Sequence, residues 1–177
     1  MTPQESFIKK VFDGPAISVR TYAKGDYVIR EGQVEQSLYL IESGAVRVFH
    51  VTEFEEQTIR FGYQGSVITS LSSFITGDPS ELYMEALRKT TLRAVQRNKL
   101  FEVVNENTEN QRIYIGMLER LIVQQMEREV DLLTESPTKR LQRVLDRSPN
   151  LFQEIPLKYI ASYLRMTPET LSRIRNS

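Results

Sequence analysis

The sequence contains no cysteine, and this absence removes several kinds of chemistry at once. Disulfide bonds, thiolate metal sites, iron–sulfur clusters and cysteine nucleophiles all need that residue, so none of them is expected. No run of apolar residues approaches the roughly 18 that a membrane-spanning helix requires, and residues 1–10 lack the apolar stretch of a signal peptide. We therefore expect a cytoplasmic protein with no membrane partner.

Histidine is scarce as well. His50 is the only one, and it lies in the alternating segment 45–51, which is typical of a strand surface. A metal site built on imidazoles normally needs two or more of them. A serine–histidine–aspartate triad around His50 is conceivable, but nothing near it resembles a nucleophile elbow. We predict no catalytic residue, no metal and no enzyme activity, and only a bound metal ion would revive an enzyme of the related barrel class.

The net charge of zero conceals an uneven distribution. Residues 1–136 hold 15 Lys/Arg and 20 Asp/Glu, a net of −5, whereas residues 137–177 hold 8 Lys/Arg and 3 Asp/Glu, a net of +5. At 177 residues and 40% hydrophobic content, the chain can bury the core of one medium domain and a small one. The basic end suits a phosphate backbone, and the acidic remainder would be repelled by it.

The first part of the chain predicts a short helix followed by a β-domain. Apolar residues between Phe7 and Phe12 recur at helical spacing. From about residue 16 to residue 96, runs rich in valine, isoleucine, tyrosine and threonine are separated by glycine and proline turn signals. The predicted strands are 16–22, 27–30, 37–41, 45–51, 57–63, 82–86 and 91–95. This interval is typical of a sandwich or jelly roll, with no helix of ordinary length inside it.

A helical pattern returns at about residue 98, and residues 108–133 predict one long helix without proline. Its apolar stripe is broader than the edge of a β-domain would cover. Packing against the chain's own β-domain is one use of the stripe, and pairing with a second copy is the one we favour. The expected dimer interface consists of Met117, Leu118, Leu121, Ile122, Gln125 and Met126.

The carboxyl-terminal segment predicts a helix-turn-helix. Ser136 and Pro137 end the long helix and begin another, and Phe152 and Ile155 are expected to close a small core. Beyond them, apolar residues at helical spacing with Ala161 between them predict two short helices crossing closely. Thr167 suits the N-cap of the second helix and Pro168 its first position. The residues left for contact with DNA are Arg165, Thr167, Glu169, Thr170, Ser172, Arg173 and Arg175.

The order of these parts resembles the Crp/Fnr family of bacterial transcription regulators. The resemblance rests on Lys24-Gly25-Asp26, Glu31-Gly32, the strand-like segment Leu38–Val48, the long helix and the tail Ala161–Arg173. It implies an α+β chain: an N-terminal double-stranded β-helix or jelly roll (1–107), a long dimerisation helix (108–135) and an all-α helix-turn-helix domain (136–177). It also implies a homodimer on palindromic DNA, with RNA polymerase as a further partner.

In that family the roll binds a cyclic nucleotide through a phosphate cassette, opened by a Gly-Glu pair and closed by an arginine followed by serine or threonine. The corresponding residues here are Gly65 and Ser66 at the opening, and Ser80 and Glu81 at the closing region. A buried phosphate needs a cationic partner, and Glu81 would repel it. The resemblance therefore makes a cyclic nucleotide a candidate, but the residues disfavour cyclic AMP and leave other effectors, or none. Arg60 or Arg88 could substitute for the missing cation from another strand.

The tail keeps part of the family pattern and departs from the rest. Glu169 and Arg173 match the family's glutamate and arginine, which implies contacts with cytosine and guanine edges, whereas Pro168 replaces its frequent arginine. Arg165 stands where the turn usually has glycine, which predicts a strained left-handed residue. The family's β-hairpin wing would follow Arg175, and whether it is missing or truncated stays open. The alternative function is a small-molecule sensor or interaction module in which the helix-turn-helix domain (residues 136–177, called the head below) is vestigial.

Overall fold

The computed structural model describes residues 2–14 and 16–176. The first helix, α1 (Pro3–Phe12), begins with a capping box in which the Thr2 hydroxyl accepts from the backbone of Glu5 and the Glu5 carboxylate accepts from that of Thr2. Its buried residues are Phe7, Val11 and Phe12. The predicted amphipathic opening helix is therefore confirmed.

The β-domain is a roll of two four-stranded antiparallel sheets, with orders β1-β8-β3-β6 and β2-β7-β4-β5. The strands are β1 (Ser18–Tyr22), β2 (Tyr27–Ile29), β3 (Ser37–Ser43), β4 (Ala45–Val51), β5 (Glu56–Tyr63), β6 (Val67–Ile68), β7 (Tyr83–Ala86) and β8 (Thr90–Gln96). All seven predicted strands are present. One further strand, β6, was not predicted, because its two residues are too few to show an alternating pattern.

Alternating side chains of the two sheets form the core of the roll. Ile29, Ile41, Met84 and Leu92 are at most 1% exposed. The turn between β3 and β4 is close to the start of β8, because a Cβ built at Gly44 (φ +94°) would lie 2.4 Å from the Thr90 hydroxyl oxygen. Only glycine fits there without displacing its neighbours.

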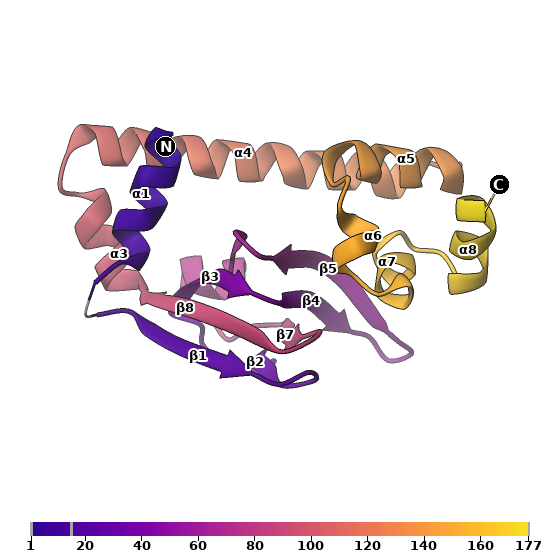
Figure 1. The fold of residues 1–177 in the computed structure, drawn as a ribbon, viewed down its shortest axis with the longest axis horizontal. Helices are drawn as coiled ribbons and strands as arrows, with labels where there is room; N and C mark the ends of the chain where they lie inside the picture. Colours follow the sequence, from indigo (N-terminus) through magenta and orange to yellow (C-terminus); the bar gives the residue numbers. More distant parts are fainter. Residues whose placement is uncertain (1, 15, 177) are drawn as a thin grey trace.

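Helices cover one side of the roll (Figure 1). A short helix, α2 (Leu71–Thr76), follows β6, and α3 (Arg97–Val104) follows β8. The long helix α4 (Thr108–Leu133) has 26 residues and spans about 39 Å at 1.5 Å per residue. Its observed ends match the prediction. α1 and α3 lie between one end of α4 and the roll, and α2 was not predicted.

The remaining helices gather at the other end of α4 (Figure 1). They are α5 (Pro137–Arg147), α6 (Leu151–Glu154), α7 (Leu157–Tyr163) and α8 (Pro168–Asn176). Ser136 caps α5 as predicted, since its hydroxyl accepts from the backbone N–H of Lys139 at 3.3 Å. Ile155 is buried and Phe152 partly so, and the core around them also contains Ala45 and Leu87 of the roll. The predicted small core therefore continues into the β-domain.

Two negative findings hold for residues 2–14 and 16–176. None of the helices is long and apolar enough to cross a membrane. No group of three or more histidine, aspartate or glutamate side chains is placed to hold a metal ion.

Candidate functional site

The carboxyl-terminal helix pair has the geometry that its sequence predicts. Ile160, Ala161, Leu164 and Leu171 are completely buried where α7 crosses α8. The Thr167 hydroxyl accepts from the backbone N–H of Thr170 at 3.2 Å and lies 3.1 Å from the Thr170 hydroxyl. Thr167 therefore caps α8 as predicted, and two of the residues assigned to DNA contact also serve this cap.

The turn between α7 and α8 contains the strained residue that the sequence indicates. Arg165 has φ 54°, and among the described residues it is the only one other than glycine with a positive φ. Its side chain is exposed. For a residue with a Cβ this conformation costs roughly 1–2 kcal/mol, so neighbouring packing must impose it. The carbonyl group of Leu164 helps, because it accepts from the Arg140 guanidinium at 2.6 Å.

The outward face of α8 carries the side chains expected to reach DNA. Glu169, Arg173 and Arg175 are exposed, while Thr170 and Ser172 are partly buried beside the buried Leu171. Glu169 and Arg173 line one shallow surface depression with Pro168 and Ser172. Within the described residues, neither Glu169 nor Arg173 forms an ion pair. Arg175 lies over the Phe152 ring at 5.7 Å, so it is turned partly toward its own core.

Several cations of the basic segment are used inside the protein, which the charge count could not reveal. Arg140 donates to the carbonyls of Thr134 and Leu164. Arg143 and Arg147 both bind the carboxylate of Asp131, which is fully buried at the end of α4. Their charge holds α5 against α4. The exposed cations of residues 136–176 that form no ion pair with another described residue are Lys139, Lys158, Arg165, Arg173 and Arg175.

The residues predicted for the phosphate cassette do not come together. Ser80 is 2% exposed, and its hydroxyl lies 2.7 Å from that of Ser70 and also bonds the backbone of Leu82. The Glu81 side chain is exposed, and its carbonyl oxygen lies 3.1 Å from Nδ1 of His50. Gly65 and Ser66 lie elsewhere, on the wall of a cavity between the roll and α4.

That cavity has a volume of about 370 Å³ and is bounded by α1, α2, α4 and the strands β3, β5 and β6. Apolar side chains form most of its wall, including Leu38, Phe74, Tyr114 and Met117. Two arginines, Arg60 and Arg120, also line it. Burial lowers the pKa of the Arg60 guanidinium. The size is in the range of small-molecule sites.

Comparison with known proteins decides the family. A family model described as "Cyclic nucleotide-binding domain" matches residues 19–107, half of the chain. The chain belongs to the cyclic nucleotide-binding domain family. It is also 27% identical over 111 residues to the transcriptional activator protein FnrA of Stutzerimonas stutzeri, an alignment that covers 63% of the chain and 42% of FnrA. The aligned part is thus less than half of the length of that relative.

Solved structures show the same fold. FixK2 from Bradyrhizobium japonicum matches with a TM-score of 0.78 and 20% identity, over 92% of this chain and 84% of that one. A CooA mutant from Carboxydothermus hydrogenoformans matches with a TM-score of 0.73 and 16% identity, over 96% and 82%. The α+β architecture is thereby confirmed. The domain match and the similarity to FnrA bear out the resemblance to the Crp/Fnr family.

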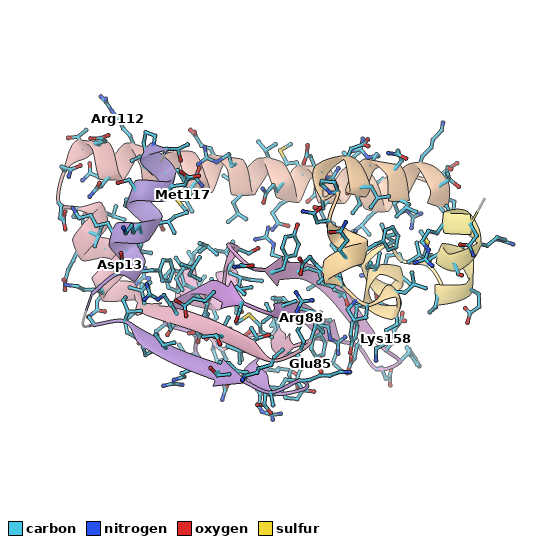
Figure 2. All side chains as sticks on the ribbon, in the orientation of Figure 1. Asp13, Glu85, Arg88, Arg112, Met117 and Lys158 are labelled. Atoms are coloured by element: carbon cyan, nitrogen blue, oxygen red, sulfur yellow. The ribbon has the colours of Figure 1, made fainter. Side chains whose placement is uncertain are left out.

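In this family member the helix α4 presents two different apolar faces. Met117, Leu118 and Leu121 line the cavity beneath the helix, and Figure 2 shows Met117 on the side toward the roll and Arg112 on the opposite side. Ile122 and Met126 are 59% and 61% exposed, and Gln125 is exposed at the junction with the head. The exposed apolar residues of α4 are Ile115, Ile122, Val123, Met126, Val130, Leu132 and Leu133. The predicted interface set therefore divides between the two faces.

The helix-turn-helix of this cyclic nucleotide-binding domain protein is attached to its own roll. The Ser162 hydroxyl accepts from the backbone N–H of Thr58 at 3.0 Å and bonds the carbonyl of Glu56 at 3.1 Å. The Tyr163 ring lies 5.3 Å from that of Phe61. The guanidinium of Arg128 lies 3.7 Å from the Tyr163 ring centroid. These contacts fix the position of α7 relative to β5 and α4.

A second attachment lies at the edge of the roll, where Figure 2 labels Arg88. Its guanidinium binds both the carboxylate and the carbonyl of Glu154 and also the carbonyl of Gly44. Arg88 was one candidate for a substitute phosphate ligand, but its donors are engaged here. Sequence reasoning missed these attachments because they join residues up to 106 positions apart, for which a single sequence carries no periodic signal.

Proposed function

We propose that this protein is a homodimeric, DNA-binding transcription regulator of the Crp/Fnr type that inserts α8 into the major groove. The observation that carries the proposal is the arrangement of α8. Leu171 is completely buried against α7, while Glu169 and Arg173 stand exposed on the other side without an ion pair among the described residues. A recognition helix needs this division between a packed side and an unpaired polar side.

The chemistry of the exposed face suits direct reading of bases. Arg173 can donate two hydrogen bonds to a guanine, and Glu169 can accept from the amino group of a cytosine, each contact contributing about 1–3 kcal/mol of discrimination. Arg165 and Lys158 lie beside the start of α8 around a shared surface groove. Their charges are placed to neutralise phosphates, which supplies affinity rather than sequence preference.

Pairing of two chains follows from the outer face of α4. Ile115, Ile122, Met126, Val130 and Leu133 recur at intervals of three, four and seven residues, which is the spacing of a coiled-coil seam. All five are at least 48% exposed in the single chain. A two-fold pair would cover this seam and present two copies of α8 to half-sites about 34 Å apart. RNA polymerase is proposed as a further partner on the family resemblance alone. The cytoplasm is proposed as the location on the expectation drawn from the sequence.

The effector of this regulator, in our proposal, is not cyclic AMP. The hydroxyls of Ser70 and Ser80 bond each other at the predicted cassette, and both residues are at most 2% exposed. Among the described residues, no arginine bonds either serine, so none is in place there to offset the desolvation of a cyclic phosphate. One structurally similar protein is named a c-di-GMP responsive regulator, so this fold also occurs with an effector other than cyclic AMP.

Footprinting across a bacterial genome tests the proposal. The full chain, incubated with genomic fragments, is expected to protect short two-fold-symmetric sequences. The variant Glu169→Ala should protect the same regions with relaxed preference at one base pair of each half-site, because a single base contact is removed. Absence of any protected sequence, together with a small molecule co-purified in stoichiometric amount, would instead favour the sensor module with a vestigial head.

A further inference from the structure

The cavity beneath α4 combines an apolar wall with cations that no carboxylate balances. No aspartate or glutamate is among the residues that line it. The two charged residues are Arg60, from β5, and Arg120, from α4. Arg120 is exposed and donates to the side-chain oxygen of Gln4 at 2.6 Å, a neutral partner from α1. Both charges at this cavity are therefore positive.

Arg60 is the less solvated of the two. It is partly buried, and no hydrogen bond or ion pair joins its guanidinium to another described residue. Burial lowers the pKa of this group, which is the direction expected for a cation deprived of water. An arginine remains charged under these conditions, so the cost of its desolvation is not offset within the protein. An anion in the cavity would offset it.

Other parts of the wall are apolar. Phe74, Leu100 and Met117 belong both to its lining and to the core that joins α1, α3 and the roll. A ligand that fills about 370 Å³ therefore meets both cations and hydrocarbon. Gln4, Ser66, Thr69 and Gln124 also line the cavity. A cationic group would find no carboxylate among the lining residues, and polar groups placed against the apolar part of the wall would lose their hydrogen bonds to water.

We propose that this cavity binds an amphiphilic anion, with an apolar chain or ring held under α4 and one carboxylate or phosphate-type group paired with Arg60. Its wall includes Gly65 and Ser66, the residues assigned to the opening of the phosphate cassette, but neither Ser70 nor Ser80 contributes to it. Calling this ligand an effector rests on the proposed function, but its binding does not.

Arg60 is also placed where binding would affect the head. It lines a second cavity, of about 540 Å³, between β5, α4 and the head, together with Arg128, Arg147 and Tyr163. Its neighbour Phe61 lines both cavities and contacts the Tyr163 ring of α7. An anion that draws the Arg60 guanidinium toward α4 removes positive charge from this junction. The ligand and the orientation of the helix-turn-helix are thereby linked through one side chain.

Calorimetric titration of the full chain with four ten-carbon probes tests the proposal. The probes are decanoate, decyl phosphate, decanol and decyltrimethylammonium, each below its micellar concentration. We expect saturable binding of one anion per chain, at least tenfold weaker binding of decanol, and no binding of the cation. The two anionic probes show which head group is preferred. Equal binding of the anions and the cation, or no binding of either anion, would overturn the proposal without any variant being needed.

Variants then locate the site. Arg60→Met keeps most of the apolar stem and removes the charge, so it should weaken decanoate binding at least tenfold while decanol binding stays the same. Arg20→Met, on the exposed strand β1, is the matched control and should bind decanoate as the unmodified chain does. Undiminished decanoate binding by Arg60→Met would contradict the assignment. DNA binding is measured separately, on the unmodified chain without probe. If DNA binding is absent, the proposed function is wrong, but the result for the cavity is unaffected.

Discussion

The hydroxyl oxygens of Ser70 and Ser80 lie 2.7 Å apart in the interior of the roll, and Ser80 is one of the residues assigned to the closing region of the phosphate cassette. Ser80 also bonds the carbonyl and the N–H of Leu82, so its capacity is used within the loop that it closes. Opening this pair to admit a phosphate would break a buried hydrogen bond, and no described cation bonds either serine to offset the charge of the anion.

We accordingly expect that cyclic AMP does not stabilise the protein. A ligand present at 100 times its Kd raises the free energy of unfolding by about 2.7 kcal/mol, which a thermal melt detects readily. Cyclic AMP at 1 mM, a concentration on the order of the weakest useful affinities, should leave the Tm where 5′-AMP leaves it. A saturable rise in Tm that is specific to the cyclic compound would show that the cassette opens.

The joint between α4 and α5 depends on Asp131. This carboxylate is completely buried and binds both Arg143 and Arg147, whose side chains are 39% and 29% exposed. Asp131→Asn removes the negative charge that pairs with both arginines. We expect the free energy of unfolding to fall by roughly 2–3 kcal/mol, which is below the full cost of breaking a buried pair because the arginines reach water. Urea unfolding gives the free energy, and faster proteolysis near residues 134–136 would show that the joint loosens.

Glu127→Gln is the matched control for that substitution. Glu127 contacts the same Arg147 at 3.4 Å, but its side chain is 40% exposed. A pair of this kind is worth about 1 kcal/mol at most. Equal destabilisation by the two variants would mean that burial of Asp131 does not set the strength of the joint.

The sequence was informative where a periodic pattern and an end signal coincide. The bounds of α4 could be predicted because its apolar repeat is uninterrupted and Ser136-Pro137 marks the next helix. The strands followed from alternation and turn glycines. β6 and α2 escaped prediction because segments of two and six residues show less than two periods of any pattern.

Contacts between distant residues could not be predicted. Met117 and Met126 both belong to the apolar stripe of α4, yet the first lines the cavity and the second is exposed. Periodicity places residues on a helix face but does not say what that face meets. For the same reason the charge count gave a basic head without showing that Arg140, Arg143 and Arg147 are used internally.

The outer face of α4 gives a direct test of pairing. Met126→Glu introduces a charge at a position that is 61% exposed in the single chain and lies at the centre of the proposed seam. We expect sedimentation equilibrium to show a dimer for the unmodified chain and a monomer for the variant, because the seam would bury an unpaired carboxylate. Val19→Glu, at a 55% exposed position on β1, should leave the dimer intact. A dimer that withstands Met126→Glu would place the interface elsewhere.

Arg165 should show opposite effects on stability and on DNA affinity. Arg165→Gly removes the strain of a left-handed conformation, roughly 1–2 kcal/mol. It also raises the entropy of the unfolded chain, which costs up to about 1 kcal/mol, so the free energy of unfolding should increase by about 0.5–1 kcal/mol. The lost charge should weaken DNA binding and reduce the slope of log affinity against log salt concentration by about one. Urea unfolding and binding titrations measure the two effects. Arg165→Asn removes the same charge with a smaller gain in stability, so DNA affinity that differs between the two variants would contradict the phosphate role.

Fluorescence anisotropy of a labelled promoter fragment, titrated with the full chain between 50 and 200 mM salt, tests the central claim most directly; this range spans roughly the conditions in which phosphate contacts dominate. The account predicts affinity that falls steeply with salt, by about 0.9 logarithmic unit per phosphate contact for each tenfold rise in salt, and a further loss of about 1–3 kcal/mol in Arg173→Ala. The control Arg20→Ala should bind as the unmodified chain does. Affinity that is indifferent both to salt and to Arg173→Ala would contradict the account.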